Sequence, residues 1–562
     1  MRISSRVSLL LVSLSVATCA NFAQLKSPLN DTVEPFSIRR GSSFTASGGS
    51  TGVGSSRPSS IAADIAEVEA IIRANSVEGK QLDSNEMTKL ALDGALRALD
   101  PHSSYFDARE WQDMLDEEQS GYTGIGATIA NFESGGVSDT YVLATAPGSP
   151  AARAQLKFGD RIVAINGEKM SGRDTDIVRD QIRGAVGSVF RLTVERAATK
   201  RMETIEVRRG RVAQPSIPDA YILRPGVGYI ELSEGFNYTT SDEMDVALRE
   251  LKKQGMRALI LDLRGNPGGI VDQAVKVAEK FLPSGTLILT QRGRSSIDNR
   301  VWKSGNSNPE TMPLVVLVNE DTASASEIVA GAFQDNDRAM IVGGRTFGKG
   351  LVQSVIDLPQ RTGLTLTTAR YLTPSGRSIQ RDYSKLDYRD YYDHKSVVSD
   401  IDRPYFEART VTNRRVYGGD GIQPDETVKD SRLTNDQARL LDPIFFFTRE
   451  IANGRTPRSS VFQPAAFAKG WFAESILVDD KLVASFESYV TSTTGEKLSA
   501  EALRANADFI KLRLRYELAI AARGLNAGDQ VLLQDDPQAA KAVSMLPQAA
   551  QLARLAEGIR NK

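Results

Sequence analysis

The chain has 562 residues, enough for several domains, and its 41% hydrophobic and 25% charged residues are typical of soluble globular proteins. Its formal net charge is -1 and it has no basic stripe, so we expect no nucleic-acid partner. The only histidines are His102 and His394 and the only cysteine is Cys19. This nearly excludes tetrahedral zinc sites, so we expect no metal or other cofactor, and a hydrolase with this sequence would need a general base other than histidine.

Residues 1–23 have the pattern of an export signal. Two arginines precede an apolar stretch over residues 7–17, and small residues after it offer alternative cleavage points. The sequence VATC, which ends at Cys19, is also a poor version of a bacterial lipoprotein box, because Thr18 is larger than the residue usual there. We expect a periplasmic or otherwise extracytoplasmic protein, which associates with a membrane only if Cys19 is lipidated.

Residues 24–60 are rich in Ser, Gly and Thr, and this composition predicts a disordered linker. Apolar residues recur at helical spacing from Ile61, which predicts the start of ordered structure. A second helix is predicted over residues 87–99, and a third ends near Glu118. Residues 61–118 are therefore predicted to be an N-terminal helical region.

From Gly121 the pattern changes to a glycine loop, short strands and one helix. Residues 119–212 resemble a PDZ domain, and the likeness includes the turn GDRI at 159–162 and a helix predicted at 174–184. The segment GYTGIG stands where PDZ domains bind a peptide carboxylate through backbone N–H groups while the peptide adds to a sheet edge. The resemblance therefore implies peptide binding at Tyr122, Gly124, Ile125 and Gly126.

Strands and helices alternate over residues 213–430, which predicts an α/β layer structure. A buried strand at 258–263 leads into the tight turn RGNPGG and then a helix, and residues 313–333 repeat this strand–turn–helix layout. Two such turns side by side would bring backbone N–H groups of Gly268 or Gly269 near Ser324. Alternatively, these glycines only allow the chain to form a tight turn.

Ser324 lies at the second strand-to-helix junction, ahead of a helix predicted at 326–333. A helix N-terminus offers free N–H groups and partial positive charge to an oxyanion, so a serine there is suited to nucleophilic work. Ser324 and Glu327 equally fit a capping box, which is the favoured interpretation of this segment taken alone. Lys349 follows between two glycines, and no carboxylate lies in residues 345–353. Alternatively, Lys349 is an exposed lysine in a loop without a catalytic role.

Beyond Gln353, residues 383–405 are rich in tyrosine and charge and are predicted to be an insertion. Residues 431–562 are mostly helical by spacing and are predicted to be a C-terminal extension. This extension either mediates assembly or covers the core. Its apolar stripe is expected to be core rather than interface, at Leu440, Ile444 and Phe447.

Several motifs, in this order along the chain, resemble the C-terminal processing peptidases, also called tail-specific proteases. They are LDPHS at 99–103, LRGNPGG at 263–269, TASASE at 322–327, TFGKG at 346–350 and GIQPD at 421–425. The resemblance covers roughly residues 61–425. It implies a multidomain α/β fold: a ClpP/crotonase-like α/β protease core with an inserted PDZ domain, a helical N-terminal segment and a helical C-terminal extension.

The resemblance implies a serine endopeptidase that recognises substrate C-terminal tails through its PDZ domain and cleaves through an acyl-enzyme. By the family's motif spacing, Ser324 would be the nucleophile, Lys349 the general base, and Gln353 the residue that orients the lysine. Ser326 is the alternative nucleophile. The oxyanion hole would be formed by backbone N–H groups of Ala325 and of Gly268 or Gly269.

A lysine base must be neutral, and burial favours the neutral amine. Phe347 and Val352 are the nearby apolar residues expected to bury Lys349. His102 follows Asp-Pro at a helix end and is assigned a structural role, and His394 falls in the insertion and is expected at the surface.

Two other functions remain open from the sequence. A peptide-binding scaffold with the same domains would have no need to keep both Ser324 and Lys349. A crotonase-like acyl-transfer enzyme would share the oxyanion glycines, but the PDZ body and the export signal argue against cytosolic cofactor chemistry. The expected partners are proteins or peptides with free C-termini. An adaptor or activator and a homo-oligomer also remain open.

Overall fold

The computed structural model describes residues 58–76, 83–384, 386, 388–392, 406–429, 433–459, 462, 478–493 and 498–561. The predicted export signal, Cys19 and His394 lie outside these residues. Helix α1 (Pro58–Asn75) begins inside the predicted linker. In the described ranges, no helix has both the length and the apolar character needed to cross a membrane.

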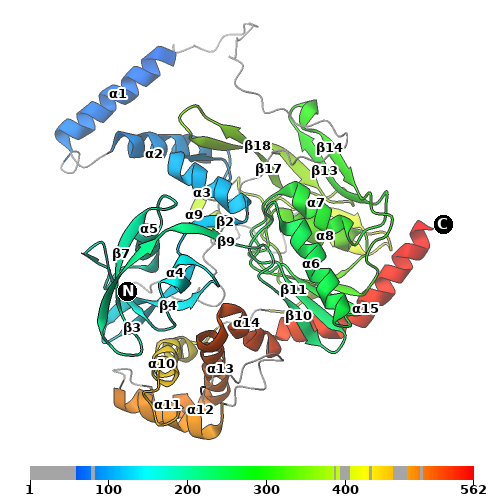
Figure 1. The fold of residues 1–562 in the computed structure, drawn as a ribbon. Helices are drawn as coiled ribbons and strands as arrows, with labels where there is room; N and C mark the ends of the chain where they lie inside the picture. The colour runs from blue at the N-terminus through cyan, green and yellow to red at the C-terminus, as the bar shows by residue number, and fades with distance from the viewer. Residues whose placement is uncertain are drawn as a thin grey trace.

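The largest lobe, which holds β10 and β11 in Figure 1, is built around a six-stranded sheet. Its strand order is β10-β11-β12-β15-β16-β21. Only β10 runs antiparallel to its neighbour, and the other pairings are parallel. The strands are β10 (Asp219–Arg224), β11 (Val227–Glu231), β12 (Ala258–Asp262), β15 (Leu314–Val318), β16 (Met340–Gly343) and β21 (Glu426–Thr427). Because β12 and β15 are parallel neighbours, the turns that follow them lie side by side.

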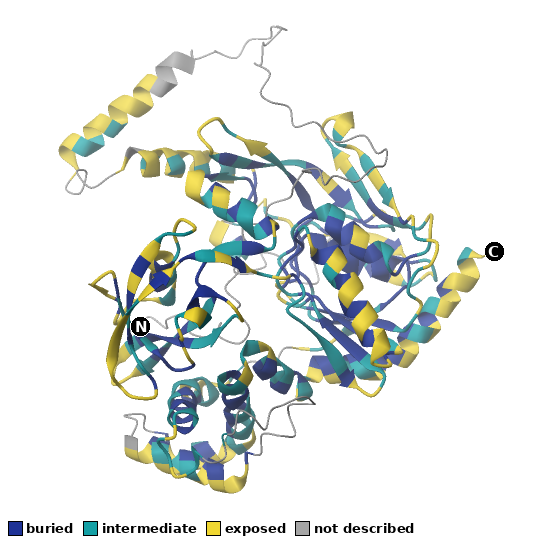
Figure 2. Ribbon diagram, in the orientation of Figure 1, coloured by how far each residue is buried: buried dark blue, intermediate teal, exposed yellow. Residues whose placement is uncertain are grey.

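Helices cover both faces of this sheet, which explains why β15 is fully buried (Figure 2). Leu314, Val316 and Val318 pack on one face against α6 (Thr240–Lys253), α7 (Val271–Glu279) and α8 (Ala325–Asp335). Val315 and Leu317 pack on the other face against α15 (Pro537–Arg560). The last helix of the chain is therefore part of the core.

A second sheet has the order β1-β18-β13-β14, with β17 paired to β18. Its strands are β1 (Ser104–Phe106), β13 (Leu287–Gly293), β14 (Arg300–Lys303), β17 (Leu351–Asp357) and β18 (Gly363–Leu372). The N-terminal helices α2 (Ser84–Arg97) and α3 (Ala108–Glu118) lie beside it (Figure 1). The strand pair β1–β18 joins the predicted N-terminal region to the segment that follows Lys349.

A separate small lobe lies between β2 (Gly121–Gly124) and β9 (Gly210–Ala213), which pair with each other. Its sheet has the order β3-β4-β5-β7-β8, with β6 beside β5. These elements are β3 (Ala127–Ser134), β4 (Val137–Thr145), β5 (Arg161–Ile165), β6 (Glu168–Lys169), β7 (Val189–Glu195) and β8 (Met202–Arg208), with α4 (Pro150–Arg153) and α5 (Thr175–Ile182). The strand β3 is at the edge of this sheet.

The C-terminal segment forms a helical lobe below the small lobe (Figure 1). Its helices are α10 (Asn435–Ala452), α11 (Asp480–Thr493), α12 (Ala500–Ala505), α13 (Ala507–Arg523) and α14 (Leu525–Gln534). Leu440, Ile444 and Phe447 lie in its core, which confirms their predicted burial. Phe445 instead leaves this core and stacks on Phe132 of β3, with ring centroids 3.6 Å apart and planes 5° apart.

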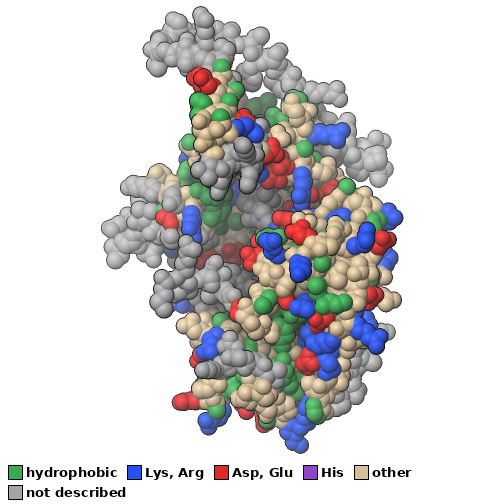
Figure 3. Space-filling view, turned by 90° about the vertical axis from the view of Figure 1, so that its left-hand side faces the viewer, with side chains coloured by type: hydrophobic (Ala, Val, Ile, Leu, Met, Phe, Trp, Pro, Cys, Tyr) green, Lys and Arg blue, Asp and Glu red, His purple; other side chains and the backbone are tan. Residues whose placement is uncertain are grey.

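Charged side chains of both signs are intermixed on the face shown in Figure 3. This agrees with the balance of 69 Lys and Arg against 70 Asp and Glu.

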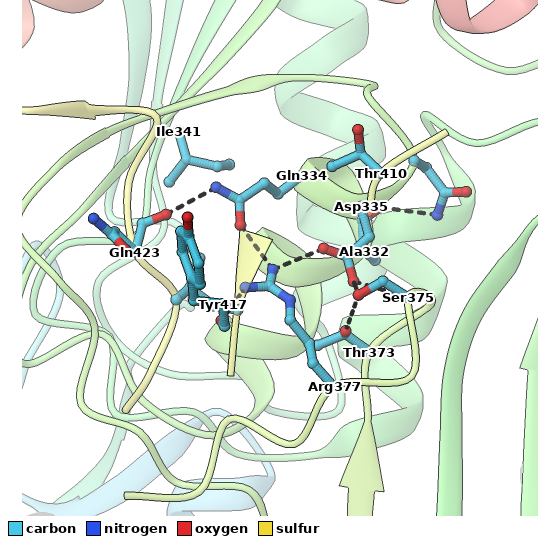
Figure 4. Close-up of polar contacts among 12 residues, drawn as sticks. Ala332, Gln334, Asp335, Ile341, Thr373, Ser375, Arg377, Thr410, Tyr417 and Gln423 are labelled. Atoms are coloured by element: carbon cyan, nitrogen blue, oxygen red, sulfur yellow. Dashed lines mark hydrogen bonds and ion pairs between the residues drawn. The ribbon is translucent and has the colours of Figure 1, made fainter. Parts of the chain in front are cut away.

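A buried ion pair fixes the end of α8. Arg377 and Asp335 are both fully buried and lie 2.7 Å apart (Figure 4). The guanidinium also donates to Gln334 Oε1 at 2.7 Å and to the Tyr417 carbonyl at 2.6 Å. Asp335 accepts further hydrogen bonds from the backbone N–H and the hydroxyl of Ser375. One arginine therefore joins α8, the segment after β18, and β20 (Arg415–Tyr417).

We expect Arg377→Ala to lower the free energy of unfolding by about 3–5 kcal/mol, because it leaves the Asp335 carboxylate buried without its cation. Chemical denaturation would measure the change. Arg409→Ala is the matched control, since the Arg409–Glu407 pair has side chains 45% and 42% exposed and should contribute about 1 kcal/mol or less. Equal effects of the two substitutions would contradict the expectation.

Candidate active site

Ser324 lies in the turn between β15 and α8 with an unusual backbone conformation, φ 56° and ψ -115°. Such a positive φ in a non-glycine residue costs of order 1–3 kcal/mol and is found mostly where function requires it. Helix caps normally have extended backbone, as Asp107 and Ser149 do here. A capping role alone therefore does not explain the conformation of Ser324.

The turns after β12 and β15 are bonded to each other directly. The Ala323 N–H donates to the Asn266 carbonyl at 2.9 Å, and the Thr322 hydroxyl donates to the Leu263 carbonyl at 2.8 Å. Asn266 and Thr322 are fully buried. The predicted pairing of these two turns is thus present, and it fixes Ser324 relative to the glycine turn.

The carboxylate of Glu327 joins the loop of Ser324 to the loop of Lys349. Its Oε2 accepts from the backbone N–H groups of Ser324 and Lys349, both at 2.8 Å. Its Oε1 accepts from the Gly348 N–H at 2.8 Å and from the Thr346 hydroxyl at 2.5 Å. Because one oxygen binds both backbone nitrogens, Ser324 and Lys349 must be close neighbours.

Glu327 is fully buried, and burial raises the pKa of its carboxyl to about 7. Each of its four hydrogen bonds acts in the opposite direction and lowers the pKa.

Tyr371 makes a second connection between the same two loops. Its hydroxyl contacts the Ser324 carbonyl at 3.0 Å and also the Lys349 carbonyl. Lys349 is only 1% exposed and forms no ion pair with another described residue. Phe347 and Val352, which flank Lys349 in the sequence, are also buried, as predicted.

Gln353 follows on β17, and its Oε1 is buried with no hydrogen-bond partner among the described residues. Its Nε2 donates to Thr367 Oγ1 at 3.2 Å. A buried carbonyl oxygen without a donor is free to accept one from a nearby ammonium or amine. The predicted role of Gln353 in orienting Lys349 would use this oxygen.

Gly268 lies directly against Ser324, as the two-turn arrangement requires. A Cβ atom at Gly268 would be 2.7 Å from Ser324 Cβ and 2.9 Å from the Ala325 nitrogen, and its φ is +104°. Its N–H already donates to Asn266 Oδ1 at 2.9 Å. In the described part of the chain the Gly269 N–H has no hydrogen-bond partner.

Ser326, the alternative nucleophile, uses its hydroxyl to hold the glycine turn. Its Oγ donates toward Asn266, 2.6 Å from Oδ1 and 3.1 Å from the carbonyl oxygen. Its side chain is fully buried. These contacts fit a structural role.

His102, which was assigned a structural role, is buried in the neighbourhood of Lys349. Burial holds the pKa of its imidazole well below its usual value, and the positive charges of Lys349, in its ammonium form, and of Arg381 act in the same direction. Its backbone N–H donates to Asp100 Oδ1 at 2.8 Å. The ring contacts two tyrosines of the predicted insertion, Tyr391 and Tyr392.

In the small lobe, the predicted carboxylate-binding loop leads into the edge strand β3. Ile125 is buried, and its carbonyl accepts from the Ala151 N–H at 2.8 Å. Gly126 has a φ of +70°, which suits glycine. The ring of Tyr122 lies against Gly124, where a Cβ atom would be 2.7 Å from Tyr122 Cε2. Helix α5 packs beside the edge strand β3.

Sequence reasoning did not find the connecting role of Glu327 or that of Tyr371. The spacing of Ser324 and Glu327 indicated only a helix cap. The further contacts of Glu327 are with residues 346–349, which lie on a loop that follows a different strand. Nothing in the sequence marked Tyr371, which lies on a strand of the second sheet.

The chain matches two family profiles, peptidase family S41 over residues 226–389 and a PDZ domain over residues 141–196. A carboxy-terminal-processing protease of Bartonella bacilliformis is 37% identical over 304 residues, which is 53% of this chain and 68% of that protein. A carboxyl-terminal-processing protease of Picosynechococcus sp. is 36% identical over 291 residues, 51% of this chain and 68% of that protein. The solved structure of a photosystem II D1 C-terminal processing protease is 30% identical, with a TM-score of 0.34, and covers 62% of this chain and 83% of that one.

We expect Glu327→Gln to lower the free energy of unfolding by about 1–3 kcal/mol and to reduce activity, because either amide orientation places an NH₂ group against a backbone N–H. Thermal or chemical unfolding, with an activity assay, would measure both effects. Glu320→Gln is the control, since Glu320 is exposed in the turn just before Ser324. An active Glu327→Gln variant of normal stability would refute the connecting role.

We expect Gly268→Ala to abolish activity, because the new methyl group would displace Ser324 or the Ala325 N–H. Gly265→Ala serves as the control: it has a similar positive φ, +71°, but no atom within 4 Å of the added Cβ. Both variants carry backbone strain, so kinetic assays that find them equally impaired would mean that contact with Ser324 is not the cause.

Proposed function

The chain belongs to the carboxy-terminal processing proteases of peptidase family S41, and on this premise we propose that Ser324 and Lys349 are its catalytic dyad. It is a serine-type peptidase that contains a PDZ domain, in a multidomain α/β fold with helical segments. The observation that carries the proposal is the shared carboxylate oxygen of Glu327, which binds the backbone N–H groups of both residues at 2.8 Å.

In the proposed mechanism, neutral Lys349 accepts the proton of the Ser324 hydroxyl as its oxygen attacks the scissile carbonyl carbon. The oxyanion that forms is stabilised by N–H groups at the start of α8, from Ala325, and of Gly269. Ala325 is the first residue of the helix, so its N–H has no acceptor within the helix. The lysine then returns the proton to the leaving amine, and water hydrolyses the acyl-enzyme.

Gln353 would orient the lysine. Its unpartnered Oε1 can accept a hydrogen bond from Lys349 Nζ, which leaves the lone pair of the neutral amine to face Ser324. Since Gln353 is 2% exposed, water does not compete strongly for this contact.

Substrate tails would bind in the PDZ lobe. The tail would add to the edge of β3, with its terminal carboxylate at the loop that holds Gly124, Ile125 and Gly126. We also propose the finer assignments that the sequence suggests: a ClpP/crotonase-like protease core, and export directed by residues 1–23 to a periplasmic or other extracytoplasmic site.

The test is cleavage of an unfolded model protein with an apolar C-terminus. Ser324→Ala and Lys349→Ala should each lower kcat/KM by about 1,000-fold or more, whereas Ser326→Ala should stay active if it folds. Amidation of the substrate's C-terminus should raise KM, because the PDZ loop then loses the carboxylate. A dead Ser326→Ala beside an active Ser324→Ala would show that the wrong serine has been assigned.

A further inference from the structure

Helix α9 (Tyr388–Tyr392) belongs to the tyrosine-rich insertion and packs against the lysine-bearing loop. Tyr391 is 1% exposed, and its ring meets Phe347 edge-on, with centroids 5.5 Å apart. Ala323, the residue before Ser324, lies in the same apolar cluster. Tyr391 and Tyr392 both follow residue 389, where the S41 match ends. This part of the site is therefore not given by the family motifs.

The hydroxyl groups around His102 form hydrogen bonds whose directions can be assigned. Tyr392 Oη lies 2.8 Å from the Pro101 carbonyl, which can only accept, so Tyr392 donates to it. The 3.2 Å contact between Tyr392 Oη and His102 Nδ1 must then have the histidine as donor. A neutral imidazole with its proton on Nδ1 has Nε2 as an acceptor.

The chain of hydrogen bonds continues from His102 to a glycine beside Lys349. Tyr391 lies 3.0 Å from His102 Nε2 and donates its hydroxyl proton to it. The Tyr391 oxygen accepts from Gln380 Nε2 at 3.2 Å. Gln380 Oε1 in turn accepts from the Gly350 N–H at 2.8 Å. The other hydrogen of the Gln380 amide goes to the Arg381 carbonyl, so both hydrogens of the NH₂ group are used.

The glycine on the other side of Lys349 is held through the next residue. The Arg381 N–H donates to the Gly348 carbonyl at 2.8 Å. The Arg381 guanidinium donates to the Tyr391 carbonyl at 2.6 Å and lies over the rings of Tyr391 and Phe347, 4.5 and 4.6 Å from their centroids. Tyr391 is thus the common partner of the two residues that hold both glycines.

We propose that Tyr391 is a positioning residue of the peptidase, which holds the loop that presents Lys349 by acting through Gln380 and Arg381. Glu327 and Tyr371 hold this loop from the side of the core, and Tyr391 holds it from the outer side. The proposal rests on the proposed dyad, since its effect on the reaction is exerted through Lys349.

The experiment compares Tyr391→Phe with wild type on a fluorogenic peptide substrate. We expect kcat to fall by roughly tenfold or more with KM little changed. Tyr388→Phe is the control on the same helix, since Tyr388 is 45% exposed and lies outside the hydrogen-bond chain. A purely structural role would lower stability and leave the kcat of the folded enzyme unchanged.

A double-mutant cycle tests whether Tyr391 acts through Gln380. Gln380→Met removes the next link, so its effect on kcat should overlap with that of Tyr391→Phe, and the double variant should be little worse than either single one. Additive effects, or an unchanged kcat for Tyr391→Phe, would overturn the proposal. If Tyr391→Phe does not fold at the assay temperature, the kcat of Gln380→Met takes its place, and an unchanged kcat there would also overturn it.

Lys349→Ala separates this proposal from the proposed dyad. An inactive Lys349→Ala with an unaffected Tyr391→Phe would leave the dyad standing and refute the role of Tyr391. An active Lys349→Ala would refute both.

Discussion

The buried carboxylate of Glu327 joins the two loops on which the candidate chemistry depends. A carboxylate with no exposed surface is unfavourable unless it is fully hydrogen-bonded, and here it accepts from three backbone N–H groups and one hydroxyl. Those donors belong to the loop of Ser324 and to the loop of Lys349. The buried carboxylate is therefore fully hydrogen-bonded only when the two loops keep this arrangement. This constraint lets a turn after one strand and a loop after the next act as one unit.

The sheet supports this unit by burying both of its faces. Its inner face packs on helices that follow β11, β12 and β15, whereas its outer face is covered by α15, from the far end of the chain. The extension also contacts the PDZ lobe. Phe445 stacks on Phe132, and Arg449 donates to the Gly159 carbonyl at 2.6 Å. The last part of the chain therefore connects the core sheet to the lobe in which tails are proposed to bind.

The tyrosine-rich insertion also packs against the active site. Residues that looked like a variable, charged loop in the sequence supply Tyr391 and Tyr392, which surround His102 together with Phe347. Further along the chain, β20 provides Tyr417, whose carbonyl binds the buried Arg377 (Figure 4). Segments outside the family motifs thus complete the packing around residues inside them.

Local sequence determined the elements whose signals are local. The buried strand predicted at 258–263 corresponds to β12, since its apolar run and the turn after it lie within one short stretch of sequence. The apolar run at 313–318 and the two strand–turn–helix units were predicted for the same reason, and motif order indicated the family. Only the tertiary structure decided which N–H groups are free, because Gly268 donates to Asn266 and Gly269 does not. It also decided what Glu327 and Tyr391 contact, since those partners are brought together by strand order and by burial rather than by spacing along the chain.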